Sequence, residues 1–244
     1  MQRNHSHFLA ALLCIPTSLA AVLAEGSVID SFTSDTTSPE WNQSTVLNTG
    51  AVATIVFDTT TNVDQLTYSF SGGSGATQAT LLRDDSLPGV GNYVQTKISL
   101  TGTVSFSHLS GIVIDEASET PSNRSQLNAL IVDNMGRLSY FNNTGLEQVS
   151  ATNLVNPAND LWLRLTLASP TTLQGSYSTD GVTYIDYGAA IAISNVSAVG
   201  YYVGNSSVAG ATTVFDDFTV TPEPSSLGLL AVSGLLFARR RRTV

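Results

Sequence analysis

Apolar and polar residues alternate along most of the middle of this chain, and this pattern restricts the fold more than any other feature. The clearest run is residues 161–167, where four leucines alternate with Trp162, Arg164 and Thr166. Such alternation places one set of side chains on each face of a β-strand. Similar runs occur at residues 66–70, 94–100, 104–107 and 199–203. We therefore predict many short strands, each with one face toward a core.

Turn-forming residues separate these strands. Asn134-Met135-Gly136 divides a hairpin at residues 130–140, and Asp180-Gly181 divides another at residues 173–184. No segment shows a long 3.6-residue period, and charged residues make up only 12% of the chain. Many short strands with regular turns are typical of a β-sandwich or a β-barrel. The sequence predicts an all-β, two-sheet antiparallel sandwich.

The charge distribution excludes one class of partner. The formal net charge is −9, and half of the basic residues lie at the two ends of the chain. An acidic body with few lysines repels phosphate backbones, so we expect no nucleic-acid binding. The single cysteine, Cys14, lies near the N-terminus, so no disulfide is expected in the body.

The N-terminus has the pattern of a secretory signal peptide. Arg3 precedes an apolar stretch from Phe8 to Leu23, and small residues follow near Ala24. The apolar stretch contains Pro16 and is shorter than the ~20 residues of a typical membrane-spanning helix. We predict a signal peptide over residues 1–24, with cleavage after Ala24.

The C-terminus combines three parts in a fixed order. Pro222, Glu223 and Pro224 come first, an apolar run follows at residues 227–238, and an arginine cluster closes the segment with Arg239, Arg240, Arg241 and Arg242. The apolar run is short for a stable span, and the arginines favour the cytoplasmic side. We expect the run to form a short helix, with the body outside and the tail inside. The triplet, run and cluster closely resemble the PEP-CTERM sorting signal of Gram-negative bacteria.

This resemblance implies recognition by an exosortase, an integral-membrane processing enzyme. Processing near Pro222-Glu223-Pro224 would end a transient anchoring in the inner membrane and release the body to the cell envelope or the medium. Proteins with this signal typically accompany exopolysaccharide production, so exopolysaccharide is the implied partner. The expected organisation is a signal peptide (residues 1–24), a β-sandwich (residues 25–220) and a sorting tail (residues 221–244).

The body also carries family-like phrases. The strand beginning Leu161-Trp162-Leu163, the hairpin at residues 177–184 and the final strand at residues 215–220 look like the concanavalin A-like lectin/glucanase (laminin-G-like) jelly roll. Position 184 is Tyr, where that family more often has Trp. These motifs are structural, so the resemblance implies a two-sheet jelly roll and not an activity.

The sequence offers little catalytic chemistry. A glycoside hydrolase needs two carboxylates facing each other across a cleft. The only acidic cluster is Asp115, Glu116 and Glu119, in which the first two are adjacent and would point to opposite faces of a strand. His108 is the only histidine after the leader, and we expect it at the surface. We therefore expect a non-catalytic protein.

A calcium site is the one metal site that the sequence suggests. Asp216 is an even number of residues from Phe218, and Asp30 from Phe32, so we expect both carboxylates to point inward. The first and last strands of such sandwiches are commonly neighbours, and oxygen ligands suit calcium. The alternative is that these carboxylates only accept hydrogen bonds from the protein.

Exposed aromatic rings are the candidates for glycan binding. Trp162 lies opposite the leucines of its strand, and Tyr184 and Tyr187 follow in the next hairpin. Packing inside the protein is the alternative for these rings. We expect a secreted matrix protein associated with exopolysaccharide; a glycoside hydrolase or lyase and a structural or adhesive protein that binds other proteins are the alternatives.

Overall fold

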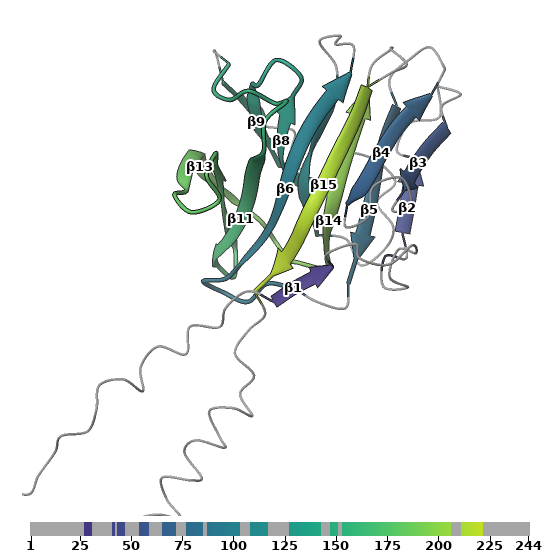
Figure 1. Ribbon diagram of the computed structural model, residues 1–244. Helices are drawn as coiled ribbons and strands as arrows, with labels where there is room; N and C mark the ends of the chain where they lie inside the picture. Colours follow the sequence, from purple (N-terminus) through teal and green to yellow (C-terminus); the bar gives the residue numbers. More distant parts are fainter. Residues whose placement is uncertain are drawn as a thin grey trace, which may run out of the picture.

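A computed structural model describes residues 27–30, 41, 43–46, 54–58, 65–71, 77–84, 87–102, 108–116, 127–142, 147–150, 153–205 and 211–221. The regular elements in these ranges are strands, which form two antiparallel sheets packed face to face (Figure 1). The predicted all-β sandwich is therefore confirmed. The predicted signal peptide and C-terminal apolar helix lie outside the described residues. Among the described residues, no helix is long and apolar enough to cross a bilayer.

Sheet A has eight strands. Their order is β13-β12-β11-β6-β15-β4-β3, and β1 also pairs with β15. The strands are β1 (Ser27–Asp30), β3 (Thr54–Asp58), β4 (Leu66–Ser71), β6 (Tyr93–Gly102), β11 (Leu161–Ser169), β12 (Thr172–Ser178), β13 (Ile185–Ala192) and β15 (Ala211–Val220). The predicted pairing of the first and last strands is thus confirmed.

Sheet B has seven strands in the order β10-β9-β8-β7-β14-β5-β2. They are β2 (Gln43–Val46), β5 (Thr77–Arg83), β7 (Leu109–Asp115), β8 (Leu127–Asp133), β9 (Leu138–Phe141), β10 (Glu147–Val149) and β14 (Ala198–Asn205). In each sheet a late strand inserts between two early ones, β15 between β4 and β6 and β14 between β5 and β7. This wrapped, Greek-key connectivity is that of a jelly roll.

The core lies between the two sheets. The leucines of β11 alternate with half-buried residues as the sequence predicts, and Leu163 and Leu165 are fully buried. Aromatic rings fill the space between β14 and β15, where Tyr201 lies 4.2 Å from Phe215 between ring centres. Trp41 stacks on Tyr201 at 5.2 Å and belongs to the same cluster. Burial of each such side chain is worth roughly 1.5–3 kcal/mol.

The opposite face of sheet B is also apolar and buried. It carries a second cluster that includes Leu82, Val113, Ile131 and Tyr202. Every residue of β8 is therefore buried, and this strand does not alternate between buried and exposed positions. Sheet A differs, because its outer face is polar along β6 and β11.

Both ends of the described chain lie at the same end of the sandwich. Ser27 of β1 pairs with Val220 of β15. Figure 1 shows β1 beside the arrowhead of β15. The segments on either side of the body, which the sequence predicts to be export signals, are therefore joined to it at one place.

Candidate functional site

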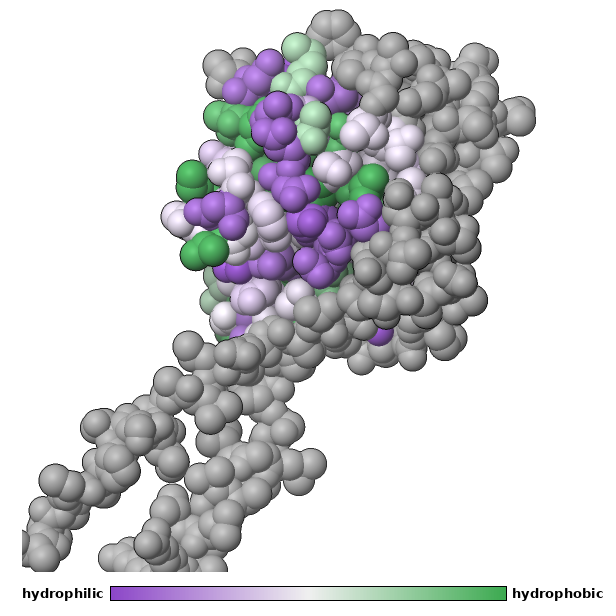
Figure 2. Space-filling model, in the orientation of Figure 1, coloured by the Kyte–Doolittle hydropathy of each residue, from purple (hydrophilic) through white to green (hydrophobic). Residues whose placement is uncertain are grey.

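The outer face of sheet A, which points away from sheet B, carries a cluster of aromatic and charged side chains. Strand pairing places Gln95 beside Arg164 and Lys97 beside Trp162. Hydrophilic side chains gather over the described part of this face (Figure 2). We define the outer-face cluster as Tyr93, Gln95, Lys97, Asp160, Trp162, Arg164, Tyr184 and Asp216.

Arg164 lies between two tyrosine rings in this cluster. Its Cζ atom is 4.0 Å from the ring centre of Tyr93 and 3.4 Å from that of Tyr184. Its Nε and Nη2 atoms donate to Oε1 of Gln95 at 3.0 and 2.6 Å, and the Tyr184 hydroxyl donates to the same oxygen at 2.7 Å. Burial raises the pKa of the Tyr184 phenol, although the Arg164 charge acts in the opposite direction. The four side chains therefore hold one another in place.

Lys97 is the second positive charge on this face. Its Nζ atom is 2.9 Å from Asp216 and 3.6 Å from Asp160, and it lies 6.0 Å from the ring centre of Trp162. Burial lowers the pKa of Lys97, but hydrogen bonding and charge from Asp216, with the charge of Asp160, outweigh burial and raise the pKa overall. The lysine stays charged at neutral pH.

The turn that follows β12 covers part of Trp162. The Asp180 carboxylate accepts hydrogen bonds from the N–H groups of Thr183 at 2.7 Å and Val182 at 2.8 Å, and from the Ser178 hydroxyl at 2.7 Å. These bonds, that of Thr183 first, lower the pKa of Asp180. Gly181 has φ +73° and lies so close that a Cβ there would be 3.0 Å from the indole. One side of Trp162 is thus closed by the protein.

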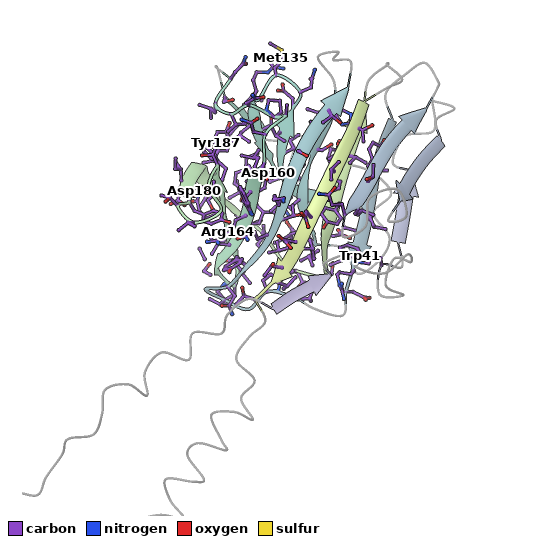
Figure 3. All side chains as sticks on the ribbon, in the orientation of Figure 1. Trp41, Met135, Asp160, Arg164, Asp180 and Tyr187 are labelled. Atoms are coloured by element: carbon purple, nitrogen blue, oxygen red, sulfur yellow. The ribbon has the colours of Figure 1, made fainter. Side chains whose placement is uncertain are left out.

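The structure does not bring the three predicted glycan-binding aromatics together. Trp162 and Tyr184 lie on the outer face, but Tyr187 packs against the core. The Tyr187 hydroxyl is 2.7 Å from the carbonyl oxygen of Leu138 and 3.2 Å from that of Gln148, so it joins sheet A to sheet B. In Figure 3 Tyr187 lies nearer to β9 than Arg164 does. Tyr187 is a packing residue here.

The inward orientation expected for Asp216 is wrong. The pairing of β15 with β6 shifts between Asp216 and Thr219, where Asp217 has φ +51°. This β-bulge lets Phe218 point into the core while Asp216 reaches Lys97 on the outer face. The side chain of Asp30 lies outside the described residues, although its backbone pairs with Phe218. The calcium site therefore stays a prediction, and among the described residues no group of three or more acidic, His or Cys side chains could hold a metal ion.

The acidic cluster does not form a pair of facing carboxylates. Asp115 is buried at the end of β7, and its carbonyl oxygen accepts a hydrogen bond from the N–H of Ser197 at 2.8 Å. Glu116 accepts a bond from the Asn128 amide at 2.6 Å and bonds from the N–H and hydroxyl of Ser194. Glu119 lies outside the described residues. The carboxylate of Glu116 therefore fixes the turn at Ser194.

The surface position expected for His108 is also wrong, because its side chain is 2% exposed. Its Nε2 atom is 2.7 Å from the Thr213 hydroxyl, which is 2.6 Å from the Ser110 hydroxyl. Burial lowers the pKa of His108 to about 4. The His108 ring has a hydrogen-bond partner in Thr213. Its burial inside the protein is what argues against a role in nucleophilic catalysis.

A pocket of about 680 Å³ lies at the end of the sandwich where the chain enters and leaves. We call it the end pocket. Its described lining has three uncharged polar residues, Thr171, Ser194 and Asn195, and six apolar ones, Leu87, Pro88, Val90, Leu167, Pro170 and Val196. Sequence reasoning missed this pocket because its lining comes from three segments that are far apart in the sequence. Sequence reasoning also did not identify Tyr93, Gln95 and Arg164 as members of the site. Each of them lies an even number of residues from another outward-facing residue of its own strand.

Several solved structures resemble this one. A functionally unknown protein from Saccharomyces cerevisiae has a TM-score of 0.48 and 13% identity, with 75% of this chain and 98% of that chain covered. A xylan β-1,4-xylosidase from Bacillus halodurans C-125 has a TM-score of 0.48 and 14% identity, and the match covers 77% of this chain but only 38% of the xylosidase. A Bacillus subtilis protein of unknown function with a galectin-like fold has a TM-score of 0.44 and 12% identity, with 79% and 93% covered. No curated protein is a significant sequence match.

The strand order of the two sheets defines the body as a jelly-roll β-sandwich. Residues 220–242 match the PEP-CTERM protein-sorting motif. The predicted sorting signal is thus confirmed, and it marks the chain as an exosortase-dependent protein that is exported and sorted to the cell envelope or the extracellular space.

Proposed function

We propose that this protein is a non-catalytic component of the extracellular matrix that binds exopolysaccharide through the outer-face cluster. The observation that carries the proposal is the gathering of three aromatic rings, two cations and an amide on the open face of one sheet. Sugar rings are bound by aromatic side chains beside hydrogen-bonding groups, and charged side chains extend this binding to acidic sugars. The sorting motif, which implies export to the cell envelope or the extracellular space, supports the proposal.

The arrangement of the cluster supports binding of an extended chain. Lys97 and Arg164 lie on neighbouring strands, and the salt bridges and hydrogen bonds around them fix their positions before any ligand arrives. A preorganised surface loses little conformational entropy on binding. The turn at Gly181 narrows access to Trp162, so we expect the tyrosine and lysine side to make the main contacts.

Binding can be tested with exopolysaccharide purified from the host strain, by retardation of the protein in polysaccharide-containing native gels. We expect Tyr184→Ala and Lys97→Ala each to weaken binding at least about tenfold, which corresponds to about 1.4 kcal/mol. Tyr187→Phe is the matched control, because Tyr187 packs against the core. Equal retardation of all four proteins would assign binding to another surface, and no retardation of the unaltered protein would leave a structural or adhesive role.

Absence of catalysis is the second part of the proposal. The Glu116 carboxylate accepts hydrogen bonds from Asn128 and Ser194, and Asp115 is buried. These two observations support a binding role over hydrolysis, which needs two facing carboxylates. The test is release of reducing ends or unsaturated products from a polysaccharide panel that includes xylan. Turnover that disappears in Glu116→Ala but survives in Asp160→Ala would show that the protein is a glycosidase or lyase.

We further propose that the sorting tail anchors the protein in the inner membrane until an exosortase acts. The apolar run at residues 227–238 is short, and the arginines at 239–242 favour the cytoplasmic side. Membrane flotation of the protein from a strain without exosortase tests this step. We expect flotation with the membranes, and loss of flotation when residues 227–244 are removed.

A further inference from the structure

The end pocket and the start of the sorting tail lie at the same end of the sandwich. Thr221, the last described residue, donates its N–H to the carbonyl oxygen of Tyr93 at 2.9 Å. On the other side of β6, Gly91 donates its N–H to the carbonyl oxygen of Leu167, a pocket residue, at 2.7 Å. Two strand spacings, about 10 Å, therefore separate the exit of the tail from the pocket wall.

The tail is too short to let this end move far from the bilayer. Residues 222–226 are all that joins Thr221 to the apolar run that begins at Leu227. Fully extended, this stretch of chain spans about 20 Å. The headgroup layer takes up roughly 5–8 Å of that length. While the run is inserted, the end pocket is therefore held near the headgroups.

The lining of the end pocket suits a lipid surface. Six of its described residues are apolar, and Val90 is 47% exposed. None of the described lining residues is charged, so contact with lipid would bury no uncompensated charge there. The nearby Glu116 carboxylate, bonded to Ser194, would disfavour an anionic surface. Zwitterionic lipid is thus the expected partner.

We propose that the end pocket rests on the outer surface of the inner membrane while the sorting tail is inserted. This inference rests on the proposed anchoring. A short tether gives an effective concentration in the millimolar range, so even a weak apolar contact becomes occupied. The contact would hold the outer face of sheet A away from the bilayer plane, since that face runs along the strands and the pocket lies at their ends. Removal of the tail then releases the contact.

The contact can be measured with a fluorescent probe. Cys14 is the only cysteine, so a Cys14→Ser background allows one thiol to be placed at Val90→Cys or, as the control, at Val182→Cys. Val182 is 83% exposed in the turn after β12. Each full chain is labelled with an environment-sensitive dye and incorporated into phosphatidylcholine vesicles without exosortase. We expect a blue-shifted emission at position 90, and at least twofold stronger quenching there by nitroxide-headgroup lipid than at position 182.

The outcomes separate the two proposals. A chain that does not float with the vesicles contradicts the anchoring itself. A chain that floats but shows equal quenching at both positions overturns the lipid contact alone. A blue shift at position 90 without quenching by the lipid would mean that a protein segment occupies the pocket. That result also overturns the proposed lipid contact. Unchanged melting temperatures of both variants establish that the labelled chains are folded.

Discussion

Arg164 contacts three other members of the outer-face cluster. Its guanidinium stacks between Tyr93 and Tyr184 and donates twice to Gln95. A planar, forked cation can make these contacts at once, whereas an ammonium group cannot. The geometry of this part of the cluster therefore depends on arginine and not only on positive charge.

Replacing Arg164 with lysine should lower the free energy of unfolding by about 1–2 kcal/mol, because the stacking and one hydrogen bond are lost. Urea unfolding measures the change. Tyr184→Phe is the control, since it keeps the stacked ring and removes only the hydroxyl bond to Gln95. An Arg164→Lys variant as stable as the unaltered protein would mean that the stack contributes nothing.

His108 predicts a pH dependence of stability. Its pKa falls from 6.5 to about 4 on folding, and the ring of Tyr68 stacks near it with 6.3 Å between ring centres. The unfolded chain therefore binds a proton in the window in which the folded chain does not. Stability contributed by neutral His108 is present above pH 6.5 and is lost as the pH falls toward 4, by about 3 kcal/mol in all.

The measurement is urea unfolding at pH 7 and pH 4.5 for the unaltered chain and for His108→Gln, which keeps a hydrogen-bonding group near Thr213. The variant should lose less stability than the unaltered chain between the two pH values. If both chains lose the same amount, His108 is not the titrating group.

Parity along the strands predicted only part of the candidate site. It correctly gave Trp162 an outward position opposite the buried leucines of β11. It failed for Asp216, because the bulge at Asp217 breaks the alternation, and a bulge leaves no clear signal in one sequence. Parity also did not predict that Tyr187 packs against the core. Tyr187 pairs with the inward-facing Gly175 after a register shift.

At the scale of the strands, the sequence predicted the sandwich well. The hairpins formed by β8 with β9 and by β12 with β13 are confirmed, with their turns near Gly136 and Gly181. The burial of β8 on both faces was not predicted, because a mainly apolar run has the same pattern in a central strand as in other buried segments. The order of strands in a sheet depends on contacts between distant residues, so local patterns do not determine it.

Close packing of the strands in sheet B depends on Gly200. A Cβ at this position would lie 2.0 Å from the carbonyl oxygen of Leu81 in β5, which is backbone and has little room to move. Gly200→Ala should therefore destabilise the protein by about 3 kcal/mol, the upper end of the usual cost of overpacking.

The matched control is Gly91→Ala. Gly91 has φ +82° with nothing within 4 Å of its Cβ position, so alanine there meets backbone strain without a clash. This strain should cost only about 1 kcal/mol. Thermal unfolding of the two variants gives the comparison, and a Gly91→Ala variant that is destabilised as strongly as Gly200→Ala would contradict the steric argument.

At the scale of the whole molecule, the two ends of the described body lie together, because β1 pairs with β15. The described chain enters at β1 and leaves after β15 at a single end of the sandwich. Signals placed at both termini therefore act on the same end of the body. The outer face of sheet A runs along the strands and not across that end of the sandwich.

The most direct test of the central claim is the intact mass of the protein recovered from the envelope or medium of an exosortase-containing host, compared with an exosortase-deletion strain. We expect a chain that ends near Pro222-Glu223-Pro224 in the first strain and one that keeps Arg239–Arg242 with the membranes in the second. A chain of the same mass in both strains, with its arginine cluster intact, would contradict this expectation.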